Sequence, residues 1–123
     1  MKLHEIVSLV GGRVLSDEID LDREIEYGAA ADLMSDVLAF AKPNAVLLTG
    51  LTNSQVIRTA EMADVAAIVF VRGKMPAADT ARLAEERGIP LIVCGHTMFE
   101  ACGKLYAAGL RGSDPIPRDD PPW

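Results

Sequence analysis

The chain has 123 residues, of which 50% are hydrophobic and 24% are charged, and these proportions predict one globular domain. Its formal net charge of −6 disfavours binding to nucleic acid or to an anionic membrane, because both attract a basic face. No apolar run reaches the roughly 18 residues of a membrane span, and Met1–Glu5 do not resemble a signal peptide. The two cysteines then predict reduced thiols and a cytoplasmic location.

The first half of the chain contains two helical patterns and two short strand patterns. Apolar residues spaced as on one helix face predict a helix from Leu3 to Val10, and strands are predicted near residues 13–15 and 24–29. Asp32 is suited to cap a second helix, which Pro43 ends. The residues of this helix expected to face the core are Leu33, Val37, Leu38 and Phe40 or Ala41.

The second half of the chain alternates strands and helices regularly. Short apolar runs predict strands at residues 45–49, 66–71 and 90–94. Amphipathic patterns predict helices at about residues 53–62, from Pro76 to Arg87, and from Met98 to Gly109. This alternation predicts an α/β fold of three layers, α/β/α, around a mixed, mostly parallel sheet of about five strands. The N-terminal strands have shorter connections, so these are the strands that can run antiparallel.

The composition of the chain changes near its C-terminal end. Residues 111–123 are rich in Pro and Asp, and such a segment cannot bury enough apolar surface to fold alone. We therefore predict a folded domain over residues 1–110 and a flexible tail over residues 111–123.

Two strand-to-helix junctions are built alike, and both suggest a ligand site. One runs through Thr49–Gln55 and the other through Gly95–Glu100, and each has a Gly and then a Thr followed three residues later by Gln or Glu. A third strand ends at Arg72. The carboxyl ends of strands in an open α/β sheet are where ligands bind, and helix N-termini favour anions. The predicted ligand-binding residues are Thr49, Gly50, Thr52, Asn53, Arg72, Gly73, Gly95, His96 and Thr97.

The same residues also have purely structural explanations. Gly50 permits a tight turn and Thr52 caps the next helix without any ligand, and Thr97 fits the same description. Arg72 is equally consistent with a solvated surface position or with an ion pair across a dimer. Asp32 follows a predicted strand, so it is also placed to face the same crevice.

The sequence lacks the motifs of a phosphotransferase or of a metal site. Gly73-Lys74-Met75 has neither the leading Gly nor the hydroxyl of a phosphate-binding P-loop. Cys94, His96 and Cys102 supply three soft ligands, but their spacing matches no standard zinc site and a fourth ligand is missing. The pair Cys94–His96 also lacks an orienting third group for nucleophilic catalysis. We predict no catalytic residues, no metal and no cofactor.

Several segments of the chain resemble a known family, the stand-alone DRTGG domain. They are Asp32–Leu38, Leu48–Asn53, Ile57–Glu61, Gly88–Leu91 and Met98–Glu100, and the resemblance covers roughly residues 2–110. DRTGG domains resemble the N-terminal domain of HPr kinase/phosphorylase and share a fold with the N-terminal domain of Mur ligases. They occur beside CBS domains, in some pyrophosphatases and in some phosphotransacetylases. The resemblance implies a regulatory or dimer-forming role rather than catalysis.

Together these observations predict a non-catalytic regulatory or ligand-sensing module that dimerises and modulates a partner enzyme. Its expected ligand is a small anion such as a nucleotide. The high apolar fraction of so small a domain favours a homodimer, because surplus apolar surface tends to be buried between subunits. The alternatives are a purely structural interaction domain and a kinase-related phosphotransferase.

Overall fold

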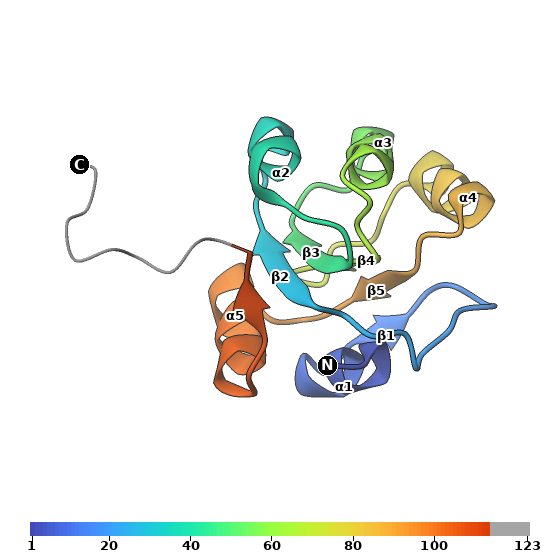
Figure 1. Cartoon of the computed structure of the whole chain (residues 1–123). Coiled ribbons are helices and arrows are strands. Elements are labelled where there is room, and N and C mark those ends of the chain that lie inside the picture. Colours follow the sequence, from blue (N-terminus) through green and yellow to red (C-terminus); the bar gives the residue numbers. More distant parts are fainter. Residues whose placement is uncertain (114–123) are drawn as a thin grey trace.

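A six-stranded sheet forms the centre of the computed structural model, which describes residues 1–113 (Figure 1). Its strand order is β1-β5-β4-β3-β2-β6, and β1 alone runs antiparallel to its neighbour. The strands are β1 Arg13–Val14, β2 Tyr27–Ala30, β3 Ala45–Thr49, β4 Ala67–Phe70, β5 Leu91–Val93 and β6 Arg111–Gly112. The sheet is therefore mixed and mostly parallel, as predicted, and it has one strand more than expected.

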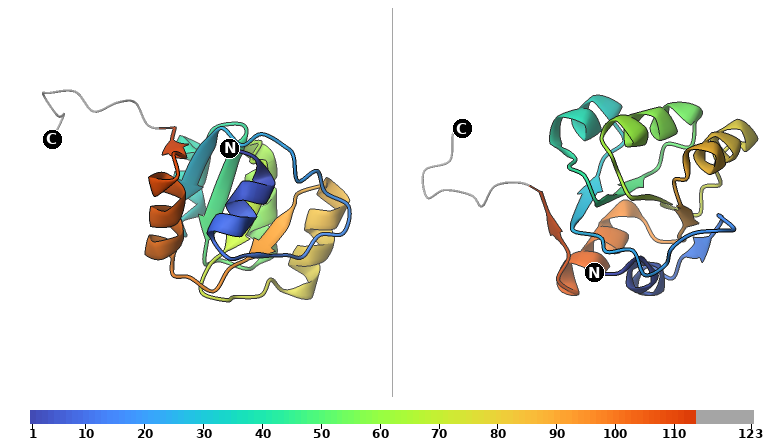
Figure 2. Two further views of the ribbon diagram at one scale, coloured as in Figure 1. Left: turned by 90° about the horizontal axis from the view of Figure 1, so that it is seen from below. Right: turned by 45° about the vertical axis from the view of Figure 1, so that its right-hand side comes forward.

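Five helices complete the three predicted layers. Helices α1 (Leu3–Leu9) and α5 (Met98–Ala107) cover one face of the sheet, and the other three cover the opposite face (Figures 1 and 2). Those three are α2 Met34–Phe40, α3 Ser54–Met62 and α4 Ala78–Arg87. None of the helices within residues 1–113 is long and apolar enough to cross a membrane.

The apolar side chains of the central strands divide between two cores. Successive residues of a strand point to opposite faces, so Val46 and Leu48 pack toward α1 and α5, whereas Leu47 packs toward α2, α3 and α4. In β4, Ile68 and Phe70 likewise contribute to the second core. Both faces of β3 and β4 are buried, which explains why these strands appear in the sequence as uninterrupted apolar runs.

The two N-terminal strands run in different directions. β1 pairs antiparallel with β5, whereas β2 pairs parallel with β3. The second strand also lies later in the chain than predicted, at Tyr27–Ala30, while Glu24 makes only a single antiparallel bridge with Lys2. Ile25 is buried in the core between the sheet and helices α1 and α5. Its apolar side chain explains why the sequence pattern predicted a strand that begins before Tyr27.

The folded region extends further along the chain than the sequence indicated. Arg111–Gly112, assigned to the tail, form β6 and pair with Tyr27–Gly28. Leu110, which is 6% exposed, lies against Gly28, where an added Cβ would come 3.2 Å from the leucine Cδ2 atom. Burial of Leu110 therefore directs the following residues along β2. Residues 114–123, to which the prediction of a flexible tail otherwise applies, lie outside the described residues.

Helix α2 buries much less apolar surface than predicted. Its Val37 is buried, but Leu33, Leu38 and Phe40 are 61%, 46% and 64% exposed. The prediction that these three face the core is wrong, because β2 and its two-residue neighbour β6 form a narrow sheet edge that contacts one stripe of the helix. The alternative to Phe40, Ala41, does pack against the same core as Val37. Asp32 does not cap α2 either; Leu33 occupies the N-cap position without a side-chain hydrogen bond.

Candidate functional site

The three loops predicted to bind a ligand lie at one edge of the sheet. Thr49 at the end of β3 is in register with Phe70 of β4, which is in register with Val93 of β5. The strands are parallel, so the loops at residues 49–53, 71–74 and 94–97 leave the sheet side by side. We call these three loops the carboxyl edge, and they include all nine predicted ligand-binding residues.

Backbone hydrogen bonds join the loops of the carboxyl edge. The Arg72 N–H donates to the His96 carbonyl at 2.7 Å, and the Gly73 N–H donates to the Cys94 carbonyl at 2.8 Å. Both donors have left-handed backbone angles, with φ of +59° at Arg72 and +65° at Gly73. The left-handed conformation costs a non-glycine residue about 1–2 kcal/mol, and the two hydrogen bonds offset this strain at Arg72.

Asp32, just after β2, contacts the carboxyl edge, although the sequence indicated it mainly as a helix cap. Its Oδ1 atom accepts a hydrogen bond from the Gly50 N–H at 2.7 Å and another from the Thr49 hydroxyl at 3.1 Å. The Thr49 Oγ1 atom in turn accepts from the Leu51 N–H at 3.2 Å. The Asp32 carboxylate therefore already occupies the anion position at Gly50. Its place directly after a strand was the sequence signal that it faces this edge.

The Arg72 side chain lies over Gly50. A Cβ atom added to Gly50 would come 2.8 Å from the Arg72 Nη2 atom and 3.5 Å from the Asp32 Oδ1 atom. The absence of a side chain at Gly50 thus lets the guanidinium approach the turn on the same side as the carboxylate. The pair places one positive and one negative group at the end of β3.

The helix caps at this edge are partly as predicted. Thr97 caps α5 by accepting from the Glu100 N–H at 3.4 Å. Asn53 caps α3 by accepting from the Gln55 N–H at 3.1 Å, so the assignment of this cap to Thr52 was wrong. The carbonyl of Thr52 instead accepts from the Thr80 hydroxyl at 2.8 Å, which ties the loop after β3 to α4. Capping therefore accounts for the side chains of Asn53 and Thr97.

The cysteines near the carboxyl edge are poor nucleophiles. Burial raises the pKa of the Cys94 thiol, whose Sγ atom lies 3.9 Å from the His96 carbonyl oxygen. Burial, and then the neighbouring Cys94, raise the pKa of Cys102. A thiol with a raised pKa is less often the reactive thiolate at neutral pH. Within residues 1–113, no three His, Cys, Asp or Glu side chains gather to hold a metal ion.

The carboxyl edge carries polar groups of the kinds that bind anions in proteins. Arg72 is exposed and supplies a guanidinium, which pairs well with phosphate and carboxylate groups. The first turns of α3 and α5 supply N–H groups without intrahelical partners, and each cap satisfies one of them. Asp32 adds a negative charge on the same side of Gly50 as the Arg72 guanidinium.

These features define a small three-layer α/β domain with a polar, charge-bearing edge at the ends of its parallel strands. A comparison with protein families agrees: the DRTGG domain matches residues 5–108. The chain therefore belongs to the DRTGG domain family. No curated protein matches its sequence at a significant level.

A solved structure has a similar fold. It contains the CBS and DRTGG domains of the regulatory region of Clostridium perfringens pyrophosphatase, complexed with its activator, diadenosine tetraphosphate. The TM-score is 0.66 and the sequence identity is 14%. The alignment covers 94% of this chain and 53% of that structure, so the chain spans about half the length of the pyrophosphatase regulatory region. At this identity the likeness establishes the fold.

Proposed function

We propose that this chain is a non-catalytic regulatory module that binds a small anionic ligand at the carboxyl edge. Membership of the DRTGG family supports a regulatory role, and the pyrophosphatase region of similar fold binds a nucleotide activator. The observation that carries the proposal is the Arg72 guanidinium held over Gly50. A nucleotide phosphate is the ligand group that such a cation, beside helix N-termini, recognises best.

The ligand contacts would come from both sides of the Arg72 turn. Arg72 would pair with the anionic group, while His96 and the first turn of α5 would add hydrogen-bond donors. Asp32 would exclude a second anionic group from the Gly50 amide, because its carboxylate already accepts a hydrogen bond from the Gly50 N–H at 2.7 Å. The proposed ligand is therefore one with a single phosphate or carboxylate group near the loop after β3 and with neutral parts beyond it.

Thermal-shift screening against nucleotides and phosphorylated metabolites tests the ligand proposal. A ligand at a hundredfold its dissociation constant should stabilise the fold by about 2.7 kcal/mol. Arg72→Ala should then weaken binding about 10- to 100-fold, since hydrogen bonds to a charged group contribute about 1.5–3 kcal/mol. Arg58→Ala, which removes an exposed arginine from α3, is the matched control and should leave the affinity unchanged. A ligand affinity that is unchanged in Arg72→Ala would refute the site.

We also propose that the module forms a homodimer and modulates a partner enzyme in the cytoplasm. The exposed side chains of Met62 on α3 and Tyr106 on α5 support an interface, and the two free thiols are consistent with a reducing compartment. We also propose that the fold is similar to that of the N-terminal domain of HPr kinase/phosphorylase. Light scattering over a range of protein concentrations measures the oligomeric state, and a monomer at all concentrations would refute dimerisation.

A further inference from the structure

A shallow groove lies between β2 and α2, away from the carboxyl-edge residues of the proposed ligand site. Its floor is the outer edge of β2, and its far wall is the α2 side chains of Asp36, Val37 and Phe40. The groove is lined by Gly28, Ala29, Ala30, Ala31, Asp36, Val37, Phe40, Ala41, Gly112 and Ser113. We call it the α2 groove, and most of its lining is apolar.

The α2 groove lacks a cover in the part of the chain that the structure describes. β6 pairs with Tyr27 and Gly28 only, so no strand within residues 1–113 lies against the outer edge of Ala29–Ala30. Phe40 at one end of the groove is 64% exposed, and Leu33 just before α2 is 61% exposed. Large apolar side chains exposed beside an open sheet edge are typical of a surface that another segment covers.

The chain leaves the described region inside this groove. Ser113 lines it, and its hydroxyl donates to the Phe40 carbonyl at 2.8 Å. Ten residues follow in the sequence, Asp114–Trp123, and they include four prolines and the apolar side chains of Ile116 and Trp123. At about 3.1 Å per residue in a polyproline II conformation, ten residues reach about 30 Å, whereas the seven residues of α2 span about 10 Å, so the segment is long enough to run along the groove and turn back to Phe40.

We infer that the α2 groove is the docking site of the chain's own C-terminal segment, residues 114–123. Proline-rich segments bind apolar grooves with aromatic walls at a low entropic cost, because their backbone is already restricted. A short tether also gives the segment a millimolar local concentration at the groove in which it starts. Trp123 would supply the apolar contact with Phe40, since aromatic pairs bury the largest areas.

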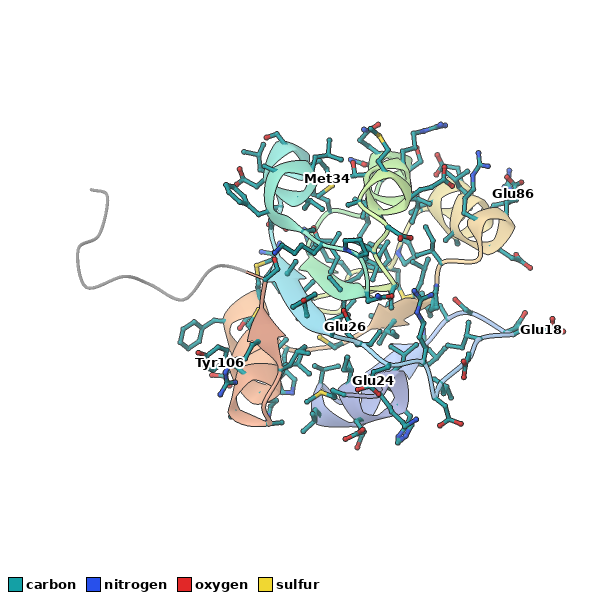
Figure 3. All side chains as sticks on the ribbon, in the orientation of Figure 1. Glu18, Glu24, Glu26, Met34, Glu86 and Tyr106 are labelled. Atoms are coloured by element: carbon teal, nitrogen blue, oxygen red, sulfur yellow. The ribbon has the colours of Figure 1, made fainter. Side chains whose placement is uncertain are left out.

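The other exposed aromatic side chain near β6 is a weaker partner for this segment. Tyr106 projects from α5 on the opposite side of the sheet (Figure 3). The Arg111 guanidinium lies 4.0 Å from the centre of its ring and also donates to the Tyr106 carbonyl at 2.7 Å. One face of Tyr106 is therefore already occupied, whereas no side-chain stacking of this kind is found on Phe40 within residues 1–113.

The fluorescence of Trp123 tests the inference on the full chain, because Trp123 is the only tryptophan. In the native protein we expect its emission to be blue-shifted, and its quenching by acrylamide to be slower, than in the urea-unfolded protein. Phe40→Ser should abolish both differences. Phe99→Ser, which changes an 85% exposed aromatic residue of α5, is the matched control and should preserve them. Native and unfolded emission that coincide would overturn the inference, as would loss of the shift in Phe99→Ser but not in Phe40→Ser.

Dilution separates docking on the same chain from docking on a second copy. An intramolecular contact should keep its blue shift over a roughly hundredfold dilution, because its effective concentration is set by the tether. A shift that disappears on dilution would assign the groove to a second copy and overturn the inference.

Deletion of residues 114–123 replaces Phe40→Ser if that variant fails to fold. Changes in NMR amide chemical shifts that are confined to β2 and α2 would support the inference, and changes confined to other elements would overturn it.

Discussion

Replacing Asp32 with alanine should destabilise the fold by about 2 kcal/mol. The change removes the carboxylate that accepts the Gly50 N–H at 2.7 Å and the Thr49 hydroxyl at 3.1 Å. Thr49 is fully buried and Gly50 is buried, so solvent does not replace both bonds. A buried donor left without a partner costs about 1–3 kcal/mol, and the exposure of Asp32 itself keeps the total near the middle of that range.

Urea unfolding measures this loss against two comparison variants. With a denaturant dependence of about 2 kcal/mol per M, the unfolding midpoint of Asp32→Ala should fall by about 1 M. Asp36→Ala removes an acid from α2 itself and should change the free energy of unfolding by less than about 0.5 kcal/mol. Asp32→Ser keeps a capping hydroxyl but is too short to replace the carboxylate, so it should resemble the alanine variant.

Two outcomes would refute the role assigned to Asp32. If Asp32→Ala and Asp36→Ala have the same midpoint, the bonds to Gly50 and Thr49 contribute nothing net. If Asp32→Ser restores the stability of the natural chain, the residue acts as the helix cap that the sequence indicated. Asp32→Asn should retain part of the stability that Asp32→Ala loses, because its amide oxygen still accepts one hydrogen bond.

Two further predictions concern the β6 edge and the thiols. Leu110→Ala should lower the free energy of unfolding by about 2–4 kcal/mol and increase amide exchange in β6. Leu21→Ala, at a 40% exposed position, is the control and should be nearly neutral. Equal losses of stability in the two variants would contradict the packing of Leu110 on Gly28. The raised pKa values of Cys94 and Cys102 mean that folding disfavours both thiolates, so the stability they contribute is complete below their unfolded pKa and declines as pH rises through the folded pKa. A thiol reagent at pH 8 should modify both cysteines more slowly in the folded than in the unfolded protein, and equal rates would contradict their burial.

The second half of the fold was predictable because its signals are local and agree with one another. The strands β3, β4 and β5 are short apolar runs buried on both faces, and the helices between them end where the sequence indicates. Helix α4, for example, ends at Gly88, whose φ of +66° suits glycine. The parallel strands place the predicted loops at one edge of the sheet, so the loops that form the candidate site could be predicted from the topology.

The misassigned features depend on contacts between residues far apart in sequence. The hydrogen-bond partners of Asp32 lie 17 and 18 residues away, so the sequence indicated the nearer helix instead. The apolar residues of α2 fit a helix pattern, but periodicity does not reveal how wide the sheet beneath a helix is. β6 has two residues and forms because Leu110 is buried, which no local propensity predicts.

The packing of α1 against α5 has a consequence for synthesis of the chain on the ribosome. The first helix buries Leu3 and Ile6, with Val10 at its C-cap, in a core that also contains side chains of β3, β4, β5 and α5. The strand β1 pairs with β5. The α1 residues precede their partners in α5 by roughly a hundred residues in the sequence. The apolar face of α1 thus stays incompletely covered until α5 has been synthesised, and until then the nascent chain exposes part of it to chaperones and to other chains.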